Sequence, residues 1–145
     1  MSTHKWATPG NLTTILSTGL NSLADSANAI SSAVDNTSDL YQNVVFEIQL
    51  ASFTPGTNPY IRLYLLYSID GGTTYADGGA STDPAFTDIV AEPAVITGTG
   101  AKVIVTKRIL LLPFHWKLLF ENKTGAALAA ASNTVKYKLF HEQDV

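Results

Sequence analysis

Three histidines are the side chains of this chain best suited to proton transfer or metal binding. His115 and His141 lie on expected strands near the C-terminus and could approach each other across a final hairpin, whereas His4 stands apart. Two histidines without a third ligand make a poor zinc site, so we expect ordinary sheet-face histidines. No Gly-x-Ser-x-Gly sequence marks a hydrolase nucleophile. A Ser-His-Asp triad, whose members lie far apart in sequence, keeps a hydrolase open as the least favoured class.

Four aspartates in and near the glycine-rich segment 70–85 offer oxygen ligands. They are Asp70, Asp77, Asp83 and Asp88. Calcium takes about six to eight oxygen ligands, but this spacing does not follow the EF-hand loop. We therefore predict a solvated loop and no metal or cofactor site, with an ion-binding loop as the alternative. No catalytic, cofactor-binding or metal-ligating residue is predicted, and we expect the chain not to be an enzyme.

The segment Ser68-Ile-Asp-Gly-Gly-Thr-Thr-Tyr75 resembles the Asp-box, Ser-x-Asp-x-Gly-x-Thr-Trp, with Tyr75 in place of the tryptophan. In such a turn the aspartate accepts hydrogen bonds from nearby amides and glycine supplies a positive φ. In sialidases the motif recurs around a propeller, away from the catalytic residues. A single copy here predicts a tight turn at the end of a strand. Tyr75 and the other aromatic residues leave a carbohydrate-binding module as an alternative.

Aromatic residues divide between the two faces of the expected strands. Trp116 and Phe120 share one face of a strand, which predicts a place in the core. Arg62 and Tyr64 lie on the opposite face of their strand from the leucines, and we expect that face to be exposed and to contact a partner. The other aromatic residues considered for a sugar platform are Tyr60, Tyr67, Tyr137 and Phe140.

Composition limits the classes of function. The chain has 145 residues, of which 46% are hydrophobic, which suits one domain with a real core. Charged residues are only 14%, against about 25% in an average soluble protein, so much of the surface is Ser, Thr, Asn, Ala and Gly. The net charge of −3 and a single adjacent basic pair, Lys107-Arg108, argue against nucleic acid as a partner.

Other composition features concern the compartment. The chain has no cysteine, so stability comes from burial and hydrogen bonds alone. We find no signal-peptide core and no run of about 20 apolar residues, and we expect synthesis in a cytoplasm and no membrane partner. Glycosylation patterns begin at Asn11, Asn36 and Asn122, and without a secretory signal we interpret them as chance.

Period-2 alternation and turn clusters predict an all-β chain. Residues 44–50 alternate apolar and polar side chains, which is typical of a half-buried strand. The segment 20–34 has apolar residues at helical spacing but is crowded with Asn, Ser and Asp, and we favour extended structure with turns over a short helix. The other expected strands are 12–20, 61–69, 86–90, 94–97, 102–112, 114–121 and 134–140. This spacing predicts a single-domain jelly roll or β-sandwich of about eight mostly antiparallel strands over residues 11–145, with an extended N-terminal arm over residues 1–10.

Several segments together resemble a group of small virion proteins of tailed bacteriophages. The matching segments, spread over about residues 20–142, are Ser31–Asn36, Leu40–Tyr41, Leu63–Gly71 with Tyr75, Pro113–Leu118, Glu121–Ala129 and Ser132–Thr134. The resemblance implies a jelly-roll or sandwich module on the capsid, as cement or decoration, or at the neck or tail. It implies no enzyme activity and no catalytic residue.

We therefore expect a phage structural protein that stabilises the head by bridging subunits of the major capsid protein. Copies of the chain itself, as a dimer or trimer, are the second expected partner. The expected location is the capsid surface of the virion, after synthesis in the host bacterial cytoplasm. A neck, tail or fibre-anchoring protein is the main alternative. The expected contact elements are residues 1–10, the loop 70–85 and the strand face with Arg62 and Tyr64.

Overall fold

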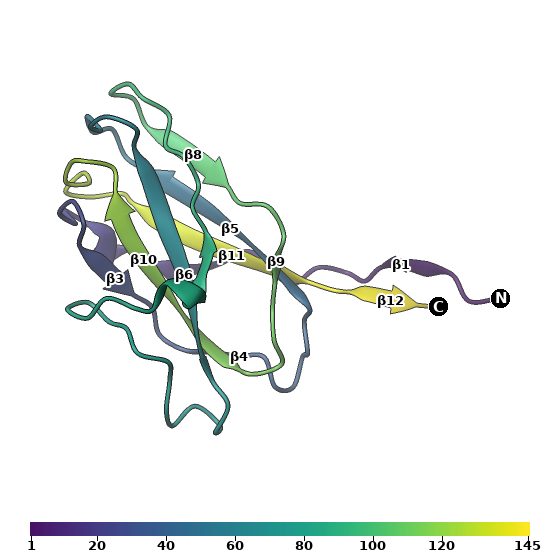
Figure 1. Cartoon of the computed structure of the whole chain (residues 1–145). Helices are drawn as coiled ribbons and strands as arrows, with labels where there is room; N and C mark the ends of the chain where they lie inside the picture. The colour runs from purple at the N-terminus through teal and green to yellow at the C-terminus, as the bar shows by residue number, and fades with distance from the viewer.

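The computed structural model describes all residues from 1 to 145, and it confirms an all-β chain with antiparallel sheets (Figure 1). Only two short 3-10 helices, Thr18–Leu20 and Phe86–Asp88, interrupt the strands. The strands are β1 (His4–Trp6), β2 (Thr13–Leu16), β3 (Asn28–Ile30), β4 (Val34–Asp35), β5 (Asn43–Leu50), β6 (Tyr60–Ser68), β7 (Ile89–Ala91), β8 (Lys102–Val105), β9 (Ile109–Leu110), β10 (His115–Lys123), β11 (Thr134–Phe140) and β12 (Glu142–Asp144).

Two five-stranded sheets form the body of the molecule. One sheet has the order β2-β11-β5-β8, with β9 also paired to β5, and we call it the β5 sheet. The other has the order β3-β10-β6-β7, with β4 also paired to β10, and we call it the β6 sheet. Every strand pair is antiparallel.

The core lies between the inner faces of these sheets, in a β-sandwich-like arrangement. The even-numbered residues of β5, from Val44 to Leu50, are almost wholly buried, as the alternation predicts. Trp116 of β10 is fully buried and crosses from one sheet to the other: its ring lies 6.2 Å from Phe46 and 5.6 Å from Tyr137, both edge-on. The prediction that Trp116 and Phe120 belong to the core is confirmed.

The expected final hairpin is wrong. Strand β10 pairs with β3, β4 and β6, whereas β11 pairs with β2 and β5, so the two strands lie in different sheets. The alanine-rich segment between them crosses from one sheet to the other, and buried Leu128 donates its N–H to Leu23 O at 3.0 Å. Strands β10 and β11 each have an apolar face, and both faces are buried because the two strands lie opposite each other across the core.

The long strand expected over residues 102–112 is also wrong, because it is interrupted. Strands β8 and β9 both pair with β5, and Thr106 lies at the break. Its N–H donates to Phe46 O at 2.9 Å, but its hydroxyl oxygen accepts from Phe46 N at 3.0 Å in place of a backbone carbonyl. Because a side-chain oxygen replaces the backbone acceptor, the regular hydrogen-bond ladder between β5 and β8 ends here. Lys107 and Arg108 follow in an exposed connection.

The segment 20–34 is extended with turns, as favoured above. Ser22 and Ser26 have positive φ angles of 56° and 63°, which end any helical turn. Three other expected strands are shorter than predicted. The strand over 12–20 is confined to β2, residues 86–90 begin as a 3-10 helix before β7, and 94–97 contributes one bridge, between Ala94 and Tyr60.

The two chain ends pair with each other. Strands β1 and β12 form a two-stranded terminal ribbon that projects from the body (Figure 1). Residues 1–10, predicted as an arm, are thus held along the chain's own C-terminus, which the sequence did not indicate. Trp6 and Phe140 pack edge-on at 5.5 Å at the base of the ribbon. No helix in the structure has the length and apolar character needed to cross a bilayer.

Candidate functional site

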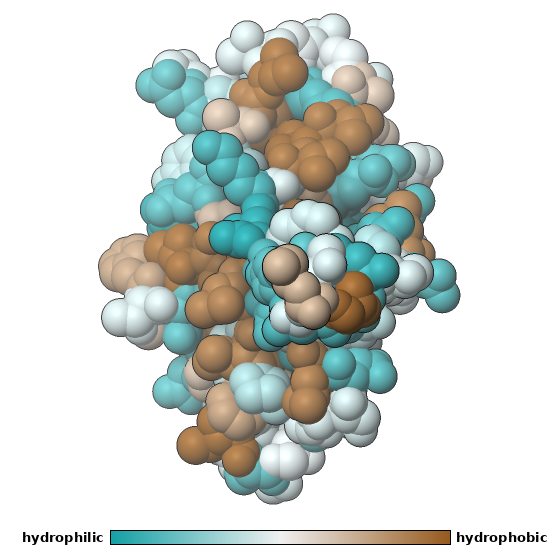
Figure 2. Space-filling view, turned by 90° about the vertical axis from the view of Figure 1, so that its right-hand side faces the viewer, coloured by the Kyte–Doolittle hydropathy of each residue, from teal (hydrophilic) through white to brown (hydrophobic).

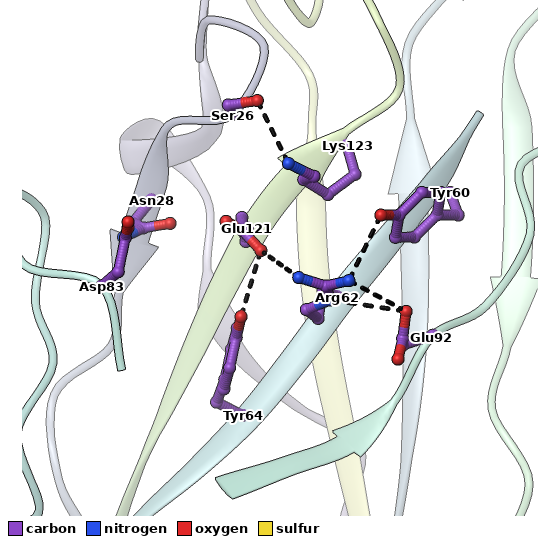
Figure 3. Close-up of polar contacts among 9 residues, drawn as sticks. All are labelled: Ser26, Asn28, Tyr60, Arg62, Tyr64, Asp83, Glu92, Glu121 and Lys123. Carbon is purple, nitrogen blue, oxygen red and sulfur yellow. Dashed lines mark hydrogen bonds and ion pairs between the residues drawn. The ribbon is translucent and has the colours of Figure 1, made fainter. Parts of the chain in front are cut away.

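A network of polar side chains covers the outer face of the β6 sheet (Figure 3). Arg62 of β6 lies at its centre, with Nη1 3.4 Å from Glu121 Oε1 of β10 and Nε 3.4 Å from Glu92 Oε2. Its Nη2 donates to the Tyr60 hydroxyl at 3.3 Å. The Tyr64 hydroxyl donates to the same oxygen of Glu121 at 3.1 Å.

Burial of this network overturns the prediction that Arg62 and Tyr64 form an exposed contact face. Tyr64 is only 2% exposed and Glu121 only 6% exposed. Burial raises the pKa of Tyr64, and its hydrogen bond to Glu121 raises it further, while Arg62 acts in the opposite direction. The hydroxyl therefore stays protonated and donates to the carboxylate.

The cover on this face comes from the start of β7 and from the loop between β6 and β7. Ile89 packs on the small cluster of Tyr64, Leu66 and Leu119. At Gly78 a Cβ atom would lie 2.9 Å from Leu66 Cδ1 and 3.1 Å from Pro84 Cβ, and φ is +150°, so only glycine fits there. The sequence signal was present in this glycine and in Ile89, but nothing in the sequence alone shows over which face the loop folds.

The charged groups of this network are paired with one another. Both carboxylates that face Arg62 are already paired with it, and its guanidinium stacks over the rings of Tyr60 and Phe86 at 5.5 and 5.6 Å. The arrangement ties β6, β10 and the loop before β7 together. We assign it a structural role, and a prediction on it is developed in the Discussion.

The Asp70 turn, residues 68–74, has the geometry that the Asp-box resemblance implies. Asp70 Oδ1 accepts from the N–H groups of Thr74 and Thr73 at 2.8 and 3.1 Å and from the Ser68 hydroxyl at 2.7 Å. Gly71 and Gly72 have φ angles of 79° and 89°. The prediction of a tight turn is confirmed. The hydrogen bond from Thr74 N–H, followed by that from the Ser68 hydroxyl, lowers the pKa of Asp70 to about 2.

We expect the Asp70 carboxyl group in this turn to titrate at an unusually low pH. Because the folded-state pKa of Asp70 is depressed, its stabilising contribution is full above the unfolded value near 3.8 and is lost as pH falls through about 2. Carboxyl NMR titration should place its midpoint near 2, and Ser68→Ala should raise that midpoint. Thr73→Ala is the matched control, since only the backbone N–H of Thr73 bonds Asp70. An Asp70 midpoint that Ser68→Ala leaves unchanged would contradict this account.

The other candidate residues of this region are occupied or dispersed. Lys117 Nζ lies 4.2 Å from the centre of the Tyr75 ring, so one face of the aromatic residue considered for sugar stacking is already covered. Asp83 accepts a hydrogen bond from Asn28 at 3.0 Å, which ties the loop to β3. No three His, Asp or Glu side chains converge in the structure in a way that could hold a metal ion.

The three histidines lie apart. His115 Nε2 is 3.6 Å from Asp35 Oδ2, and the His141 ring packs edge-on against Tyr41 at 5.3 Å. His115 is the first residue of β10, whereas His141 follows β11 in the other sheet, so the expected approach across a hairpin does not occur.

Asn36 and Asn122, which begin two of the glycosylation patterns, have fully buried side chains.

His4 is the histidine with a defined electrostatic role. In the terminal ribbon its Nε2 lies 2.6 Å from Glu142 Oε2 and its Nδ1 lies 2.9 Å from Asp144 Oδ1. Both ring nitrogens face acceptors, and only the imidazolium has two N–H donors. The hydrogen bonds to Asp144 and Glu142 raise the pKa of His4. The other charged group nearby is Arg108, 3.9 Å from Glu142.

The ribbon should therefore open as pH rises through the raised pKa of His4. A raised folded-state pKa makes the contribution of His4 full below the unfolded value of 6.5, and that contribution is lost as pH rises through the folded-state pKa. We expect the paired amides of Thr3 and Val145 to lose protection from hydrogen exchange over that range. Glu142→Gln with Asp144→Asn should bring the His4 midpoint back down, whereas Gln143→Ala should leave it in place. A midpoint unaffected by the loss of both carboxylates would refute the assignment.

The outer face of the β5 sheet carries exposed and half-buried side chains from β5, β8 and β11. Across the strands of this face, Val105 of β8 lies beside Glu47 of β5, which lies beside Lys136 of β11. In the same way Val103 lies beside Gln49, which lies beside Thr134. Val103 and Val105 are 62% and 63% exposed. Apolar groups alternate with polar ones around the end of the molecule from which the terminal ribbon projects (Figure 2). The structure thus has one sheet face closed by its own loop and one left open.

Comparison with known proteins assigns no family. No family model matches the sequence. No curated protein matches it either. Function is therefore argued from the surfaces and contacts described above.

Proposed function

We propose that this chain is a structural protein of a bacteriophage virion, a capsid decoration or cement protein that bridges subunits of the major capsid protein. The observation that carries the proposal is the contrast between the two sheets. The β6 sheet is closed by its own loop and ion pairs, whereas the β5 sheet presents an open face beside a projecting terminal ribbon. An open face that mixes β-branched, polar and charged residues suits adhesion to a large neighbour.

The strand order supports a jelly roll for this module. Without the terminal ribbon, and with β3/β4 and β8/β9 each taken as one interrupted strand, eight strands remain. The chain passes repeatedly between the two sheets, and neighbours within a sheet are distant in sequence, as in β2-β11-β5-β8. A double-sheet jelly roll has eight strands in this kind of Greek-key connection and is found among viral capsid domains.

The mechanism would be burial of surface across the joints between capsid subunits, with no bond made or broken. A shell offers many identical sites, so modest contacts are multiplied by avidity. The terminal ribbon is already paired and held by His4, so docking it onto a neighbour requires less ordering than a free arm, for which each fixed residue costs about 1–2 kcal/mol. The expected contact elements are now the ribbon and the open β5 face, in place of Arg62 and Tyr64 and of the loop 70–85, which folds over the β6 sheet.

The test uses heads of the phage that encodes the chain, prepared without this protein. Added purified chain should co-sediment with the heads and raise the temperature at which they release DNA. A variant lacking residues 1–10 should bind less and protect less, with Ile69→Lys, an exposed change in the Asp70 turn, as the control. Absence of the chain from purified virions would end the proposal. A copy number of about a dozen or fewer per virion would instead place it at the neck, tail or fibre, whereas hundreds indicate decoration.

A further inference from the structure

Strand β8, which is four residues long, ends the β5 sheet with an edge that has no outward charge, proline or bulge. Proteins shield edge strands with charged side chains, proline, bulges or a very short length, because unpaired backbone groups invite another strand. Two other edges have such features: a bulge in the pairing of β2, and Glu92-Pro93 directly after β7. The outward side chains of β8, Val103 and Val105, are uncharged, β-branched and exposed.

The one charged residue of β8 is turned away from the edge. Lys102 is buried, and its Nζ donates to Gly98 O and Gly100 O at 2.8 and 2.6 Å. It also lies 4.9 Å from the centre of the Phe53 ring. Lys102 could otherwise repel an incoming strand, but its side chain is bonded to the turn that precedes β8. No charged side chain of β8 therefore lies at its free edge.

The hydrogen-bond pattern shows which backbone groups are free. Thr106 N–H donates to Phe46 O, and antiparallel pairs alternate between bonded and non-bonded residues. Ile104 therefore directs its N–H and C=O toward Ile48 of β5. Those of Val103 and Val105 point away from the sheet, at the free edge.

We propose that β8 is a self-association site, where the β8 strands of two copies pair antiparallel about a two-fold axis at Ile104. The sequence Val103-Ile104-Val105 is the same in both directions, so Val103 of each copy lies opposite Val105 of the second copy. Those are the residues whose backbone groups are free, so each pair can exchange both hydrogen bonds while Ile104 keeps its bonds to β5. The two β5 sheets become one continuous sheet.

Charge and size set the strength of this contact. In this register Lys107 lies opposite the second copy's Ala101, and Lys102 opposite its Thr106, so no like charges meet. The shared edge is short, and an interface well below about 1,200 Å² is typical of weak, transient association. The inference deepens the proposed function, because a weak two-fold contact between copies becomes effective when both are held on one shell.

Sedimentation velocity of the purified chain, from micromolar to millimolar concentration, tests the inference without any head. The wild type should dimerise with rising concentration. Val103→Lys with Val105→Lys, and separately Val103→Glu with Val105→Glu, should each weaken dimerisation by about tenfold or more, because like charges face across the axis. An equimolar mixture of the two variants should dimerise again, since Lys then faces Glu. Ile69→Lys should behave as the wild type.

Amide hydrogen exchange gives the second readout. Val103 and Val105 should exchange fast in dilute solution and slowly at high concentration, whereas Ile104 should be slow in both. A wild type that stays monomeric at millimolar concentration, or a dimer that both charged variants retain, overturns the inference. Since neither measurement involves heads, its failure leaves the binding of heads to be judged separately.

Discussion

Replacing Asn122 by alanine is expected to lower the free energy of unfolding by about 3–5 kcal/mol, the largest effect of a polar substitution in this chain. The Asn122 side chain is fully buried. Its Nδ2 donates to the carbonyls of Leu23, Ala24 and Ala126 at 2.9, 3.1 and 2.8 Å. Its Oδ1 accepts from the N–H and the hydroxyl of Thr124 at 3.0 and 2.7 Å.

The cost arises because these partners have no water to replace the lost bonds. The variant leaves the buried Thr124 N–H without an acceptor and removes one of the two donors from each of the three carbonyls, which keep their bonds from Leu128, Ala27 and Thr124. An unsatisfied buried group costs about 1–3 kcal/mol. Urea denaturation followed by tryptophan fluorescence measures the change. Asn11→Ala, at an exposed asparagine, is the matched control and should change stability by less than about 0.5 kcal/mol. Thr124→Val, which removes only the hydroxyl, should cost about 1–2 kcal/mol and covers the case in which Asn122→Ala does not fold. A loss at Asn122 no larger than at Asn11 would contradict the assigned role.

Replacing Arg62 by methionine is expected to lower the free energy of unfolding by about 2–3 kcal/mol. Breaking a buried ion pair by removing one partner costs about 3–5 kcal/mol, and the Arg62 side chain retains 18% exposure, so part of that cost is relieved by water. The variant leaves the Glu121 carboxylate with Tyr64 as its remaining donor. It also removes the guanidinium from its position over Tyr60 and Phe86.

A double-mutant cycle isolates the pair. Adding Glu121→Gln to Arg62→Met should recover about 1 kcal/mol or more, because the uncompensated charge is then gone. Lys138→Met on the exposed face of β11 has no ion pair to lose and should change stability by less than about 0.5 kcal/mol. Strictly additive losses in the cycle would show that Arg62 acts through its stacking alone.

Strand identity was accessible from the sequence because burial imposes a period of two on each strand. The alternation from Val44 to Leu50, and the common face of Trp116 and Phe120, matched the structure. The Asp70 turn was equally local, since its donors lie within six residues of one another. An error arose where the sequence does not show what covers the outer face of a strand: Tyr64 was expected in solvent, but Ile30 of β3 and Ile89 of β7 pack against its cluster.

Buried asparagines were the class of residue that sequence reasoning missed. Asparagine was expected mainly on the surface, and Asn36 and Asn122 were considered only as chance glycosylation patterns. Asn36, Asn122 and Asn133 are nevertheless buried, and each bonds backbone groups from segments far apart in the chain. Asn is common in exposed turns, so its type alone gives no sign of such a role. Only the meeting of distant segments creates the unpaired carbonyls and amides that make a buried asparagine favourable.

The amino-acid sequence by itself determined that this chain is all-β, where its main strands lie and that Trp116 and Phe120 belong to the core, because these depend on side-chain alternation and turn chemistry between near neighbours. Tertiary structure alone decided which strands pair and that the two chain ends form a ribbon held by His4. It also decided that the outer face of the β6 sheet is covered while the edge of β8 is unpaired. Those outcomes depend on contacts between residues as far apart as Thr3 and Val145, and a local pattern carries no information on which distant partner satisfies a backbone edge or a buried charge.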